Sequence, residues 1–252
     1  MKKHLISIIW LIFCCASILP AQVSVKDSAI STSLISIFYS YQFPGGDLSK
    51  RFVSNSAIGG SYFYKTKNNW IIGADGFFMF RDTIKESGIF NSISTKDGNI
   101  IDGNGIYAEI HLYERGFYAG AKGGKLFPVF GPNKNSGIVI LCGAGLLQHK
   151  IRIENTNNTA PQIKKDYKKG YDRLTNGLAF NEFIGYMYLG NSRLVSFYAG
   201  FEFTQAWTQN RRSYNFDMMR PDETKRLDLL SGFKIGWIIP LYKRSPEKYY
   251  YN

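Results

Sequence analysis

The sequence contains few of the residues that form metal sites, disulfides and hydrolytic active sites. It has 3 cysteines and 3 histidines in 252 residues. Cys14 and Cys15 lie in an apolar segment near residue 1, and Cys142 lies alone in a second apolar stretch. A lone cysteine there forms no intramolecular disulfide and is expected to behave as a small hydrophobic residue. With His111 and His149 it does not supply the ligand spacing of a zinc site, so we expect neither a metal nor a cofactor.

Long apolar runs are also rare. Leu5 to Leu19 is one such run, preceded by the basic residues Lys2 and Lys3 and followed by Pro20-Ala21-Gln22. This order is typical of a secretory signal peptide. We therefore expect residues 1–21 to be removed by cleavage after Ala21. No later segment offers about 20 uninterrupted apolar residues, so the sequence predicts no membrane-spanning helix after the leader.

Negative charge is the scarcer sign. Lys and Arg number 31 against 19 Asp and Glu, for a formal net charge of +12. Loss of Lys2 and Lys3 with the leader lowers it to +10. An exported protein rarely meets nucleic acid, so we expect none as a partner. The charge is consistent with binding to lipid or lipopolysaccharide phosphates, or with a solvated basic surface.

Aromatic residues and glycine, in contrast, are abundant. The chain has 25 Gly, 17 Tyr and 19 Phe, which favours strands and tight turns over helices. In residues 33–43, for example, Ile35, Ile37 and Tyr39 fall on one face of a strand and Ser36 falls on the other. The same alternation predicts strands near 31–43, 56–66, 70–81, 105–114, 137–153, 177–189, 194–204 and 226–241.

These strands fit a soluble β-sandwich or a transmembrane barrel with apolar residues on lipid and polar ones in the lumen. Aromatic ends on the apolar faces, charges on the polar faces and connections of alternating length favour the barrel. The short connections are 66–69 and 190–193, and the long ones are 81–105, 154–177 and 204–226.

The number of strands is expected to be even, because both chain ends lie in the periplasm of such a barrel. Eight is the favoured number and ten the alternative. Residues 115–136 are the difficult segment, since 117–129 also alternates like a strand. Either this segment is irregular or periplasmic, or it belongs to a ten-stranded barrel together with another strand.

The last predicted strand carries a further signal. Ser231-Gly232-Phe233-Lys234-Ile235-Gly236-Trp237 is similar to the segment by which the barrel-assembly machinery recognises a final strand, with Gly232, Ile235 and Trp237 at its key positions. It departs from the usual form because the chain continues through Pro240. We expect residues 245–252 to form a periplasmic tail.

Taken together, these features resemble the small outer-membrane β-barrels of Gram-negative bacteria, of OmpA/OmpX-type size and with a Bacteroidota-like character. The resemblance covers essentially the whole mature chain as architecture. It implies an integral outer-membrane barrel over residues 22–244. It also implies outer-membrane lipid, lipopolysaccharide and the assembly machinery as partners, with other outer-membrane or periplasmic proteins as further ones.

An eight-stranded barrel is narrow enough for side chains to fill its interior. The polar faces therefore predict an ion-pair network in the lumen, with a narrow channel or proton-sensing role for His111 as the alternative. Its expected members are Lys65, Asp75, Glu109, His111, Glu202, Asp228 and Lys234.

Cations and aromatics also gather in the predicted external loops, where they suit lipopolysaccharide phosphates or a protein partner, or serve only as a solvated anchor. These residues are Lys164, Lys165, Tyr167, Lys168, Lys169, Arg173, Trp207, Arg211, Arg212 and Arg220.

Three function classes follow. The favoured one is a non-enzymatic barrel that acts as a structural or accessory subunit of an outer-membrane complex for assembly, secretion or surface attachment. The second is a narrow channel for small solutes, and the third is a lipid A-modifying enzyme. His111 and His149 are expected at opposite ends of their strands and no serine lies two residues from either, so a shared catalytic site is disfavoured.

Overall fold

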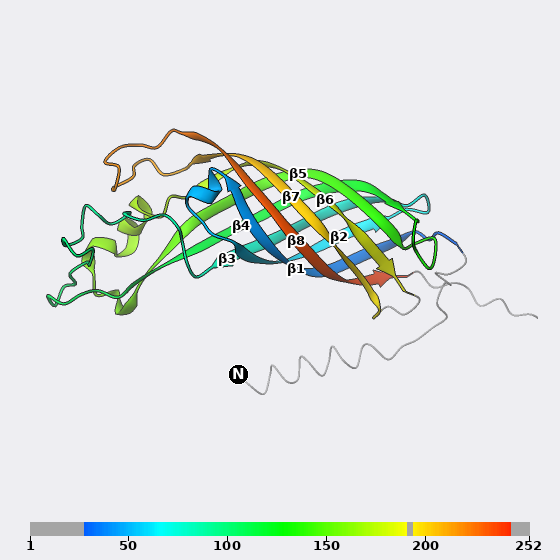
Figure 1. The fold of residues 1–252 in the computed structure, drawn as a ribbon, viewed down its shortest axis with the longest axis horizontal. Coiled ribbons are helices and arrows are strands. Elements are labelled where there is room, and N and C mark those ends of the chain that lie inside the picture. Colours follow the sequence, from blue (N-terminus) through cyan, green and yellow to red (C-terminus); the bar gives the residue numbers. More distant parts are fainter. Residues whose placement is uncertain (1–27, 191–193, 243–252) are drawn as a thin grey trace, which may run out of the picture.

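The computed structural model of the chain describes residues 28–190 and 194–242. In this part of the chain eight antiparallel strands form a closed barrel, in which each strand pairs with the next and β8 pairs with β1 (Figure 1). The predicted eight-stranded antiparallel barrel is therefore confirmed. The strands are β1 (Thr32–Gly46), β2 (Asn55–Lys65), β3 (Trp70–Arg81), β4 (Ile110–Phe127), β5 (Gly137–Asn155), β6 (Thr175–Leu189), β7 (Ser196–Asn210) and β8 (Lys225–Leu241).

The two ends of the barrel differ. The connections 66–69 and 128–136 lie at one end, together with the described residues 190 and 194–195 between β6 and β7, the start of β1 and the end of β8 (Figure 1). The connections 47–54, 82–109, 156–174 and 211–224 project from the other end. This long-loop end carries short 3-10 helices, which are η2 (Leu48–Lys50), η3 (Thr156–Asn158), η4 (Pro161–Ile163) and η5 (Lys165–Gly170).

The fourth strand corrects the sequence analysis. It was expected at 105–114, with 115–136 left as an irregular segment or as part of a ten-stranded barrel, but β4 runs without a break from Ile110 to Phe127. Its lumen-facing positions include Gly120, where a Cβ atom would lie 2.3 Å from the hydroxyl oxygen of Tyr118. The sequence pattern did not predict one continuous strand here, because the glycines and alanines of this segment weaken the alternation of apolar and polar residues. Only residues 128–136 form the turn to β5.

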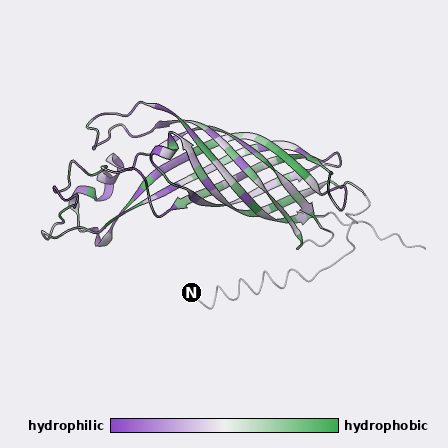
Figure 2. Ribbon diagram, viewed as in Figure 1, coloured by the Kyte–Doolittle hydropathy of each residue, from purple (hydrophilic) through white to green (hydrophobic). Residues whose placement is uncertain are grey.

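The distribution of apolar and polar side chains in the barrel is the reverse of that in a soluble protein. Large apolar side chains cover its outer wall, such as Ile72, which is 65% exposed, and Leu178, which is 68% exposed. Hydrophobic and hydrophilic residues are interspersed along the strands (Figure 2). Charged side chains such as Lys65 and Glu202 are buried in the lumen. An apolar wall of this extent is stable only in lipid, so the barrel is a transmembrane one. No helix among the described residues is long and apolar enough to cross a membrane.

Several predictions concern residues outside the described part of the chain. The signal peptide (1–21) and the periplasmic tail (245–252) both lie there and stay predictions. The assembly segment is described: Gly232 faces the lumen, whereas Ile235 and Trp237 face outward. β8 continues four residues past Trp237 to Leu241. Recognition of this segment by the assembly machinery also stays a prediction.

One charged residue interrupts the apolar wall. Glu182 is the central residue of β6, and its side chain faces outward between its cross-strand neighbours Cys142 and Phe203. Phe180 and Ile184 flank it along the strand and are both exposed to the surroundings of the barrel. The side chain of Glu182 therefore lies in the apolar belt, where an ionised carboxylate is costly.

We expect the substitution Glu182→Leu to stabilise the barrel in lipid, because it removes a carboxyl group from the hydrocarbon-facing surface. The expected gain in the free energy of unfolding is about 1–2 kcal/mol. Urea-induced unfolding in lipid vesicles, followed by tryptophan fluorescence, measures it. Phe180→Leu, at the neighbouring outward position, is the control and should give no gain. A loss of stability in Glu182→Leu would contradict this placement.

Candidate functional site: two closures of the barrel lumen

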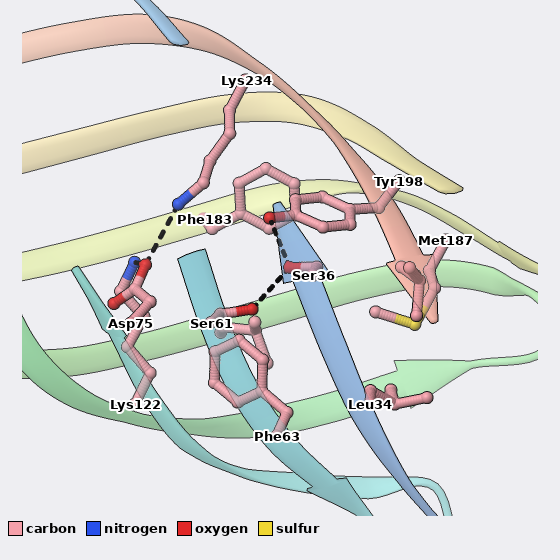
Figure 3. A pocket seen from close by; sticks show the side chains of 12 residues that line it. Leu34, Ser36, Ser61, Phe63, Asp75, Lys122, Phe183, Met187, Tyr198 and Lys234 are labelled. Atoms are coloured by element: carbon pink, nitrogen blue, oxygen red, sulfur yellow. Dashed lines mark hydrogen bonds and ion pairs between the residues drawn. The ribbon is translucent and has the colours of Figure 1, made fainter. Parts of the chain in front are cut away.

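Four charged side chains meet across the middle of the lumen, and we call them the lumen quartet. Asp75 comes from β3, Lys122 from β4 and Lys234 from β8 (Figure 3), and Glu202 comes from β7. Lys122 Nζ lies 2.6 Å from Asp75 Oδ2 and 3.0 Å from Glu202 Oε1. Lys234 Nζ lies 3.0 Å from Asp75 Oδ2 and 2.8 Å from Glu202 Oε1. Each lysine thus bridges both carboxylates, and all four side chains are at most 3% exposed.

Aromatic rings and hydroxyl groups surround the lumen quartet. Lys234 Nζ lies 3.6 Å from the centre of the Phe38 ring, and Lys122 Nζ lies 5.7 Å from that of Tyr118. Toward the short-turn end, the Ser36 and Ser61 hydroxyls are 2.6 Å apart, and Tyr198 Oη lies 3.4 Å from Ser36 Oγ (Figure 3). Two cations against two anions make the cluster neutral, which allows its burial in this apolar setting.

The space beside the lumen quartet is too small for a solute path. A cavity lined by Leu34, Phe63, Leu141, Met187 and other residues lies next to the quartet. It holds only about 20 Å³ of room for water, which is enough for roughly one molecule. The quartet and its neighbours therefore fill the cross-section of the barrel.

A second polar group lies in the lumen nearer the long loops. His149 Nε2 lies 2.9 Å from Asp228 Oδ2, and the Thr208 hydroxyl donates to the same oxygen at 2.5 Å. The hydroxyl therefore binds the carboxylate instead of the imidazole, which is the wrong arrangement for an activated nucleophile. Asn55 Nδ2 also donates to Glu114 Oε1 at 2.9 Å. These contacts show that hydrogen-bonded polar side chains pack this part of the lumen.

The structure places the predicted lumen charges in different surroundings. Asp75, Glu202 and Lys234 meet in the lumen quartet, whereas Asp228 pairs with His149. Lys65 is buried near the short-turn end, where its ammonium group donates to Ile30 O at 3.0 Å and Asn135 Oδ1 at 2.8 Å.

Two of the predicted lumen charges were placed wrongly. Glu109 lies in the loop before β4, and His111 faces outward near the start of that strand. Their side chains are 65% and 48% exposed, and they contact each other at 3.0 Å. The reason is the phase of β4, since Ile110 and Leu112 pack toward the interior and so turn the odd-numbered positions outward.

Lys122 was missed as a member of the lumen quartet. It lies in the segment 115–136, for which we predicted no single strand and therefore no lumen-facing positions. Once β4 is taken as one strand, Lys122 shares the lumen face of Glu114 and Tyr118. The signal available in the sequence was its place four residues after Tyr118, on the same face of a continuous strand.

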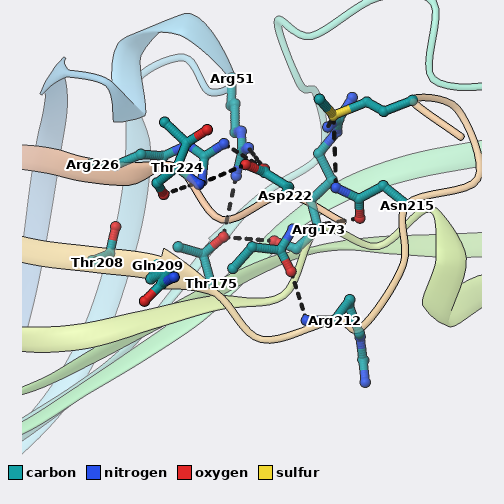
Figure 4. A network of polar contacts seen from close by, with 12 residues as sticks. Arg51, Arg173, Thr175, Thr208, Gln209, Arg212, Asn215, Asp222, Thr224 and Arg226 are labelled. Carbon is teal, nitrogen blue, oxygen red and sulfur yellow. Dashed lines mark hydrogen bonds and ion pairs between the residues drawn. The ribbon is translucent and has the colours of Figure 1, made fainter. Parts of the chain in front are cut away.

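A second ion-pair network closes the long-loop end of the lumen, and we call it the outer clasp (Figure 4). Glu86 bridges two arginines, lying 3.5 Å from Arg51 Nε and 2.8 Å from Arg173. Asp222 lies 3.7 Å from Arg51 and 2.5 Å from Arg226. These groups come from the loops 47–54, 82–109, 156–174 and 211–224 and from the start of β8, so the clasp ties all four loops together.

The loop residues predicted from the sequence divide into two groups. Arg173 is buried in the outer clasp, where it also pairs with Asp217 at 2.5 Å. Arg212 pairs with Asp172 at 2.5 Å, and Arg211 Nε donates to Asn176 Oδ1 at 2.6 Å. These arginines connect the loops to one another and to β6. The predicted residues with side chains exposed at this end or on the wall near it are Lys165, Tyr167, Lys169, Trp207, Arg220 and Arg211 itself.

The remaining lysines of this set lie on the same loop. Lys164, the residue before η5, and Lys168 are half-buried, whereas Lys169 is exposed. Lys169 Nζ lies 2.6 Å from Asp166 Oδ1, so part of its charge is locally balanced. The loop 156–174 thus presents a basic surface, but no cavity that would bind a specific anion is built around these lysines in the described structure.

Hydrogen bonds set the ionisation of the outer clasp. Burial of Asp222 favours its neutral form, but the hydrogen bonds from Arg226 and Thr224 outweigh burial and hold the pKa of this carboxyl below 3.8. The hydrogen bonds of Arg212 to Asp172 raise the pKa of that guanidinium. Both effects favour the charged, paired forms at neutral pH.

Comparison with known proteins finds only distant likenesses. No known family model and no curated protein matches the chain. Ail, the attachment invasion locus protein of Yersinia pestis, is similar with a TM-score of 0.43 and 12% identity over 83% of this chain and 99% of Ail. Neisserial surface protein A is similar with a TM-score of 0.42 and 11% identity over 82% of this chain and 96% of its own.

The outer membrane protein OprG of Pseudomonas aeruginosa is also similar, with a TM-score of 0.36 and 11% identity over 86% of this chain and 99% of OprG. These proteins are small outer-membrane barrels of Gram-negative bacteria, to which this chain is similar. The closed eight-stranded barrel itself is established by the strand register of this chain.

We expect Lys234→Met to destabilise the barrel by about 3–5 kcal/mol, because it leaves Asp75 and Glu202 to share one lysine in a buried site. The double variant Lys234→Met/Glu202→Gln restores neutrality and should recover most of this loss. Urea-induced unfolding in lipid vesicles measures both variants. Lys164→Met, in the loop, is the control and should stay within about 0.5 kcal/mol of the wild type. Equal stability of Lys234→Met and the control would show that the quartet does not hold the barrel together.

The outer clasp should loosen only in acid. A carboxyl whose pKa is lowered in the folded state stabilises that state above its unfolded pKa, and this contribution is lost as pH falls through the folded value. For Asp222 this window lies below pH 3.8. Hydrogen exchange in residues 211–224, corrected for its intrinsic pH dependence, should stay protected at about pH 5 and become fast only as the pH falls below 3.8. Arg226→Gln should move the transition to higher pH, and opening of the wild type between about pH 7 and 5 would contradict the assignment.

Proposed function

We propose that the protein is a non-enzymatic outer-membrane barrel that acts through its surfaces, as a structural or accessory subunit of an outer-membrane complex. The observation that carries this proposal is the double closure of the lumen. The lumen quartet fills the middle of the barrel, and the outer clasp ties the four long loops over its end. A barrel closed in this way offers no path for a solute, so its interactions take place on the loops and the outer wall.

The proposal also fixes the orientation of the barrel. In bacterial barrels short turns face the periplasm and long loops face the outside. The turns 66–69 and 128–136 are then periplasmic, as are the described residues between β6 and β7, the predicted tail and any partner that it contacts. The loops 82–109, 156–174 and 211–224 face outward and present the exposed aromatic side chains of Tyr107 and Tyr167 to partners.

A catalytic role has less support. The described residues contain no group of three or more histidine, cysteine, aspartate or glutamate side chains that could hold a metal ion. His149 and Asp228 are 1% exposed and lie inside the packed lumen, where a lipid substrate has no access. The narrow-channel alternative would require both closures to open.

Conductance in planar lipid bilayers tests the closed lumen. We expect no conductance steps from the wild-type protein and none from Arg51→Ala/Arg173→Ala, because the lumen quartet still fills the barrel when the outer clasp is broken. Replacing all four quartet residues by serine in this clasp variant should open a path and give steps. Steady conductance by the wild-type protein would refute the proposal and favour the channel.

Purification from the native outer membrane tests the accessory role. The tagged protein, extracted in mild detergent, should retain a stoichiometric set of other envelope proteins. Alanine at the exposed Tyr107 and Tyr167 should reduce their recovery, whereas Lys164→Ala, at a half-buried lysine, is the control. Recovery of the barrel alone would contradict the accessory role, even if the lumen proved to be closed.

A further inference from the structure

Three cationic side chains gather on the outer wall of the barrel, and we call them the wall cluster. Arg115 lies on β4, and Lys150 and Arg152 lie on β5. The strand register places Arg115 directly opposite Lys150 and places Tyr113 opposite Arg152. All of these positions alternate with buried ones such as Glu114 and Ile151, so their side chains leave the barrel on one face.

The wall cluster is not balanced by acidic residues. Like charges directly opposite each other on a sheet repel, yet Arg115 and Lys150 hold such a pair. Lys150 makes no ion pair within the described structure, and the hydrogen bonds of Arg115 go to the backbone carbonyls of Arg81 at 3.1 Å and of Glu114 at 2.6 Å. Of the three, only Arg152 makes an ion pair, with the exposed Glu154 at 3.4 Å, and the buried carboxylate of Glu114 beside Arg115 lies on the lumen side of the strand. The cluster therefore carries positive charge that no ion pair of the described structure balances, and an anion can balance it.

Tyr113 orders the wall cluster. The guanidinium carbon of Arg115 lies 4.9 Å from the centre of the Tyr113 ring, and that of Arg152 lies 6.0 Å from it. The ring thus lies between two guanidinium groups and restricts both. Because two carbonyl bonds also hold Arg115, less side-chain entropy is lost when an anion binds there.

The position of the wall cluster along the barrel indicates where the anion comes from. On the side of the short turns, the exposed Phe117 follows Arg115 on the outward face of β4. On β5 the polar Gln148 comes next, and the exposed Leu146 after it; Phe117 and Leu146 belong to the apolar belt. On the side of the long loops, the outward positions are His111 and Glu154, which are polar and exposed. The cluster therefore marks the boundary between the hydrocarbon and the polar surface.

We propose that the wall cluster binds the phosphate group of a lipid headgroup, namely that of the phosphorylated glycolipid in the outer leaflet. Two guanidinium groups supply paired donors that match phosphate oxygens, and Lys150 adds a third positive charge. The apolar belt beside the cluster would contact the acyl chains of the same lipid. This proposal rests on the membrane orientation given under Proposed function. It also assigns lipid binding to the wall instead of to the loop lysines.

Nanodiscs with defined lipids provide the test. The full mature protein is placed in phosphatidylcholine discs that contain a small fraction of either diphosphorylated lipid A or its dephosphorylated form. Native mass spectrometry then measures the lipid that stays bound. We expect retention of the phosphorylated form only, and we expect Arg115→Gln/Lys150→Gln/Arg152→Gln to lower it by about 10-fold or more.

Matched variants make the result specific. The loop variant Lys164→Gln/Lys165→Gln/Lys168→Gln/Lys169→Gln removes more charge, but it should retain the lipid within about two-fold of the wild type, since exposed charges contribute little. Arg115→Lys/Arg152→Lys keeps the charge and should bind more lipid than the glutamine variant. Faster migration of unheated samples in SDS gels confirms that each variant is folded.

Three outcomes would overturn the proposal: equal retention by the wild type and the wall variant, an equal loss in the loop variant, or full displacement of the lipid by excess inorganic phosphate. The last result would show that the cluster binds a bare phosphate and not a lipid. Conductance by the wild-type barrel would refute the closed lumen without changing the lipid measurement, so the two proposals fail separately.

Discussion

The structure depends on the pairing of two lysines with two carboxylates inside the barrel. Asp75 and Lys122 come from the neighbouring strands β3 and β4, and Glu202 and Lys234 come from β7 and β8 on the other side of the lumen. Backbone hydrogen bonds connect each strand only to its neighbours, whereas these ion pairs connect opposite walls. A shift of any one of the four strands by two residues would leave a buried charge without its partner, which is costly in this setting. The quartet therefore fixes the relative register of strands that do not touch.

The same constraint explains why the barrel is closed to solutes. An interior of eight strands is narrow, and the lysine and carboxylate side chains cross it at one level together with the rings of Phe38 and Tyr118. Above this level the loops add a second set of ion pairs, in which Glu86 and Asp222 each join two arginines. Binding is left to the surfaces, and the surface chemistry differs along the barrel from an apolar belt to a cationic boundary and then to polar loops.

Much of this arrangement could be predicted from the sequence, because alternation with period two is a local signal. It gave seven of the eight strands near their observed places and put Asp75, Glu202 and Lys234 in the lumen. The alternation is weak where the outward residues are small, as at Ala119 and Ala121. For this reason β4 was not predicted as one continuous strand, and Lys122 was not predicted to face the lumen. It also placed His111 on the wrong face, since the apolar residues Ile110 and Leu112 point inward beyond the belt.

The long-range pairings could not be predicted in this way. Arg51, Glu86 and Asp222 lie in three different loops, and no spacing in the sequence links them. Arg173 and Arg212 were predicted to belong to a binding surface because they are basic loop residues. Their carboxylate partners lie on other loops of the same end of the barrel. Pairing across a lumen depends on the closed ring, which no local pattern contains.

The pairing of β1 with β8 closes the ring, and it extends from Ser33 opposite Leu241 to Gly46 opposite Asp228. Since every strand then has two neighbours, the folded barrel has no first or last strand in a physical sense. Cutting the chain at another short turn and joining β8 to β1 would leave the same ring of hydrogen bonds. The predicted recognition by the assembly machinery would change, because Gly232, Ile235 and Trp237 would no longer lie on the final strand. The shape of the barrel is thus independent of where the chain ends, whereas the predicted route of its assembly is not.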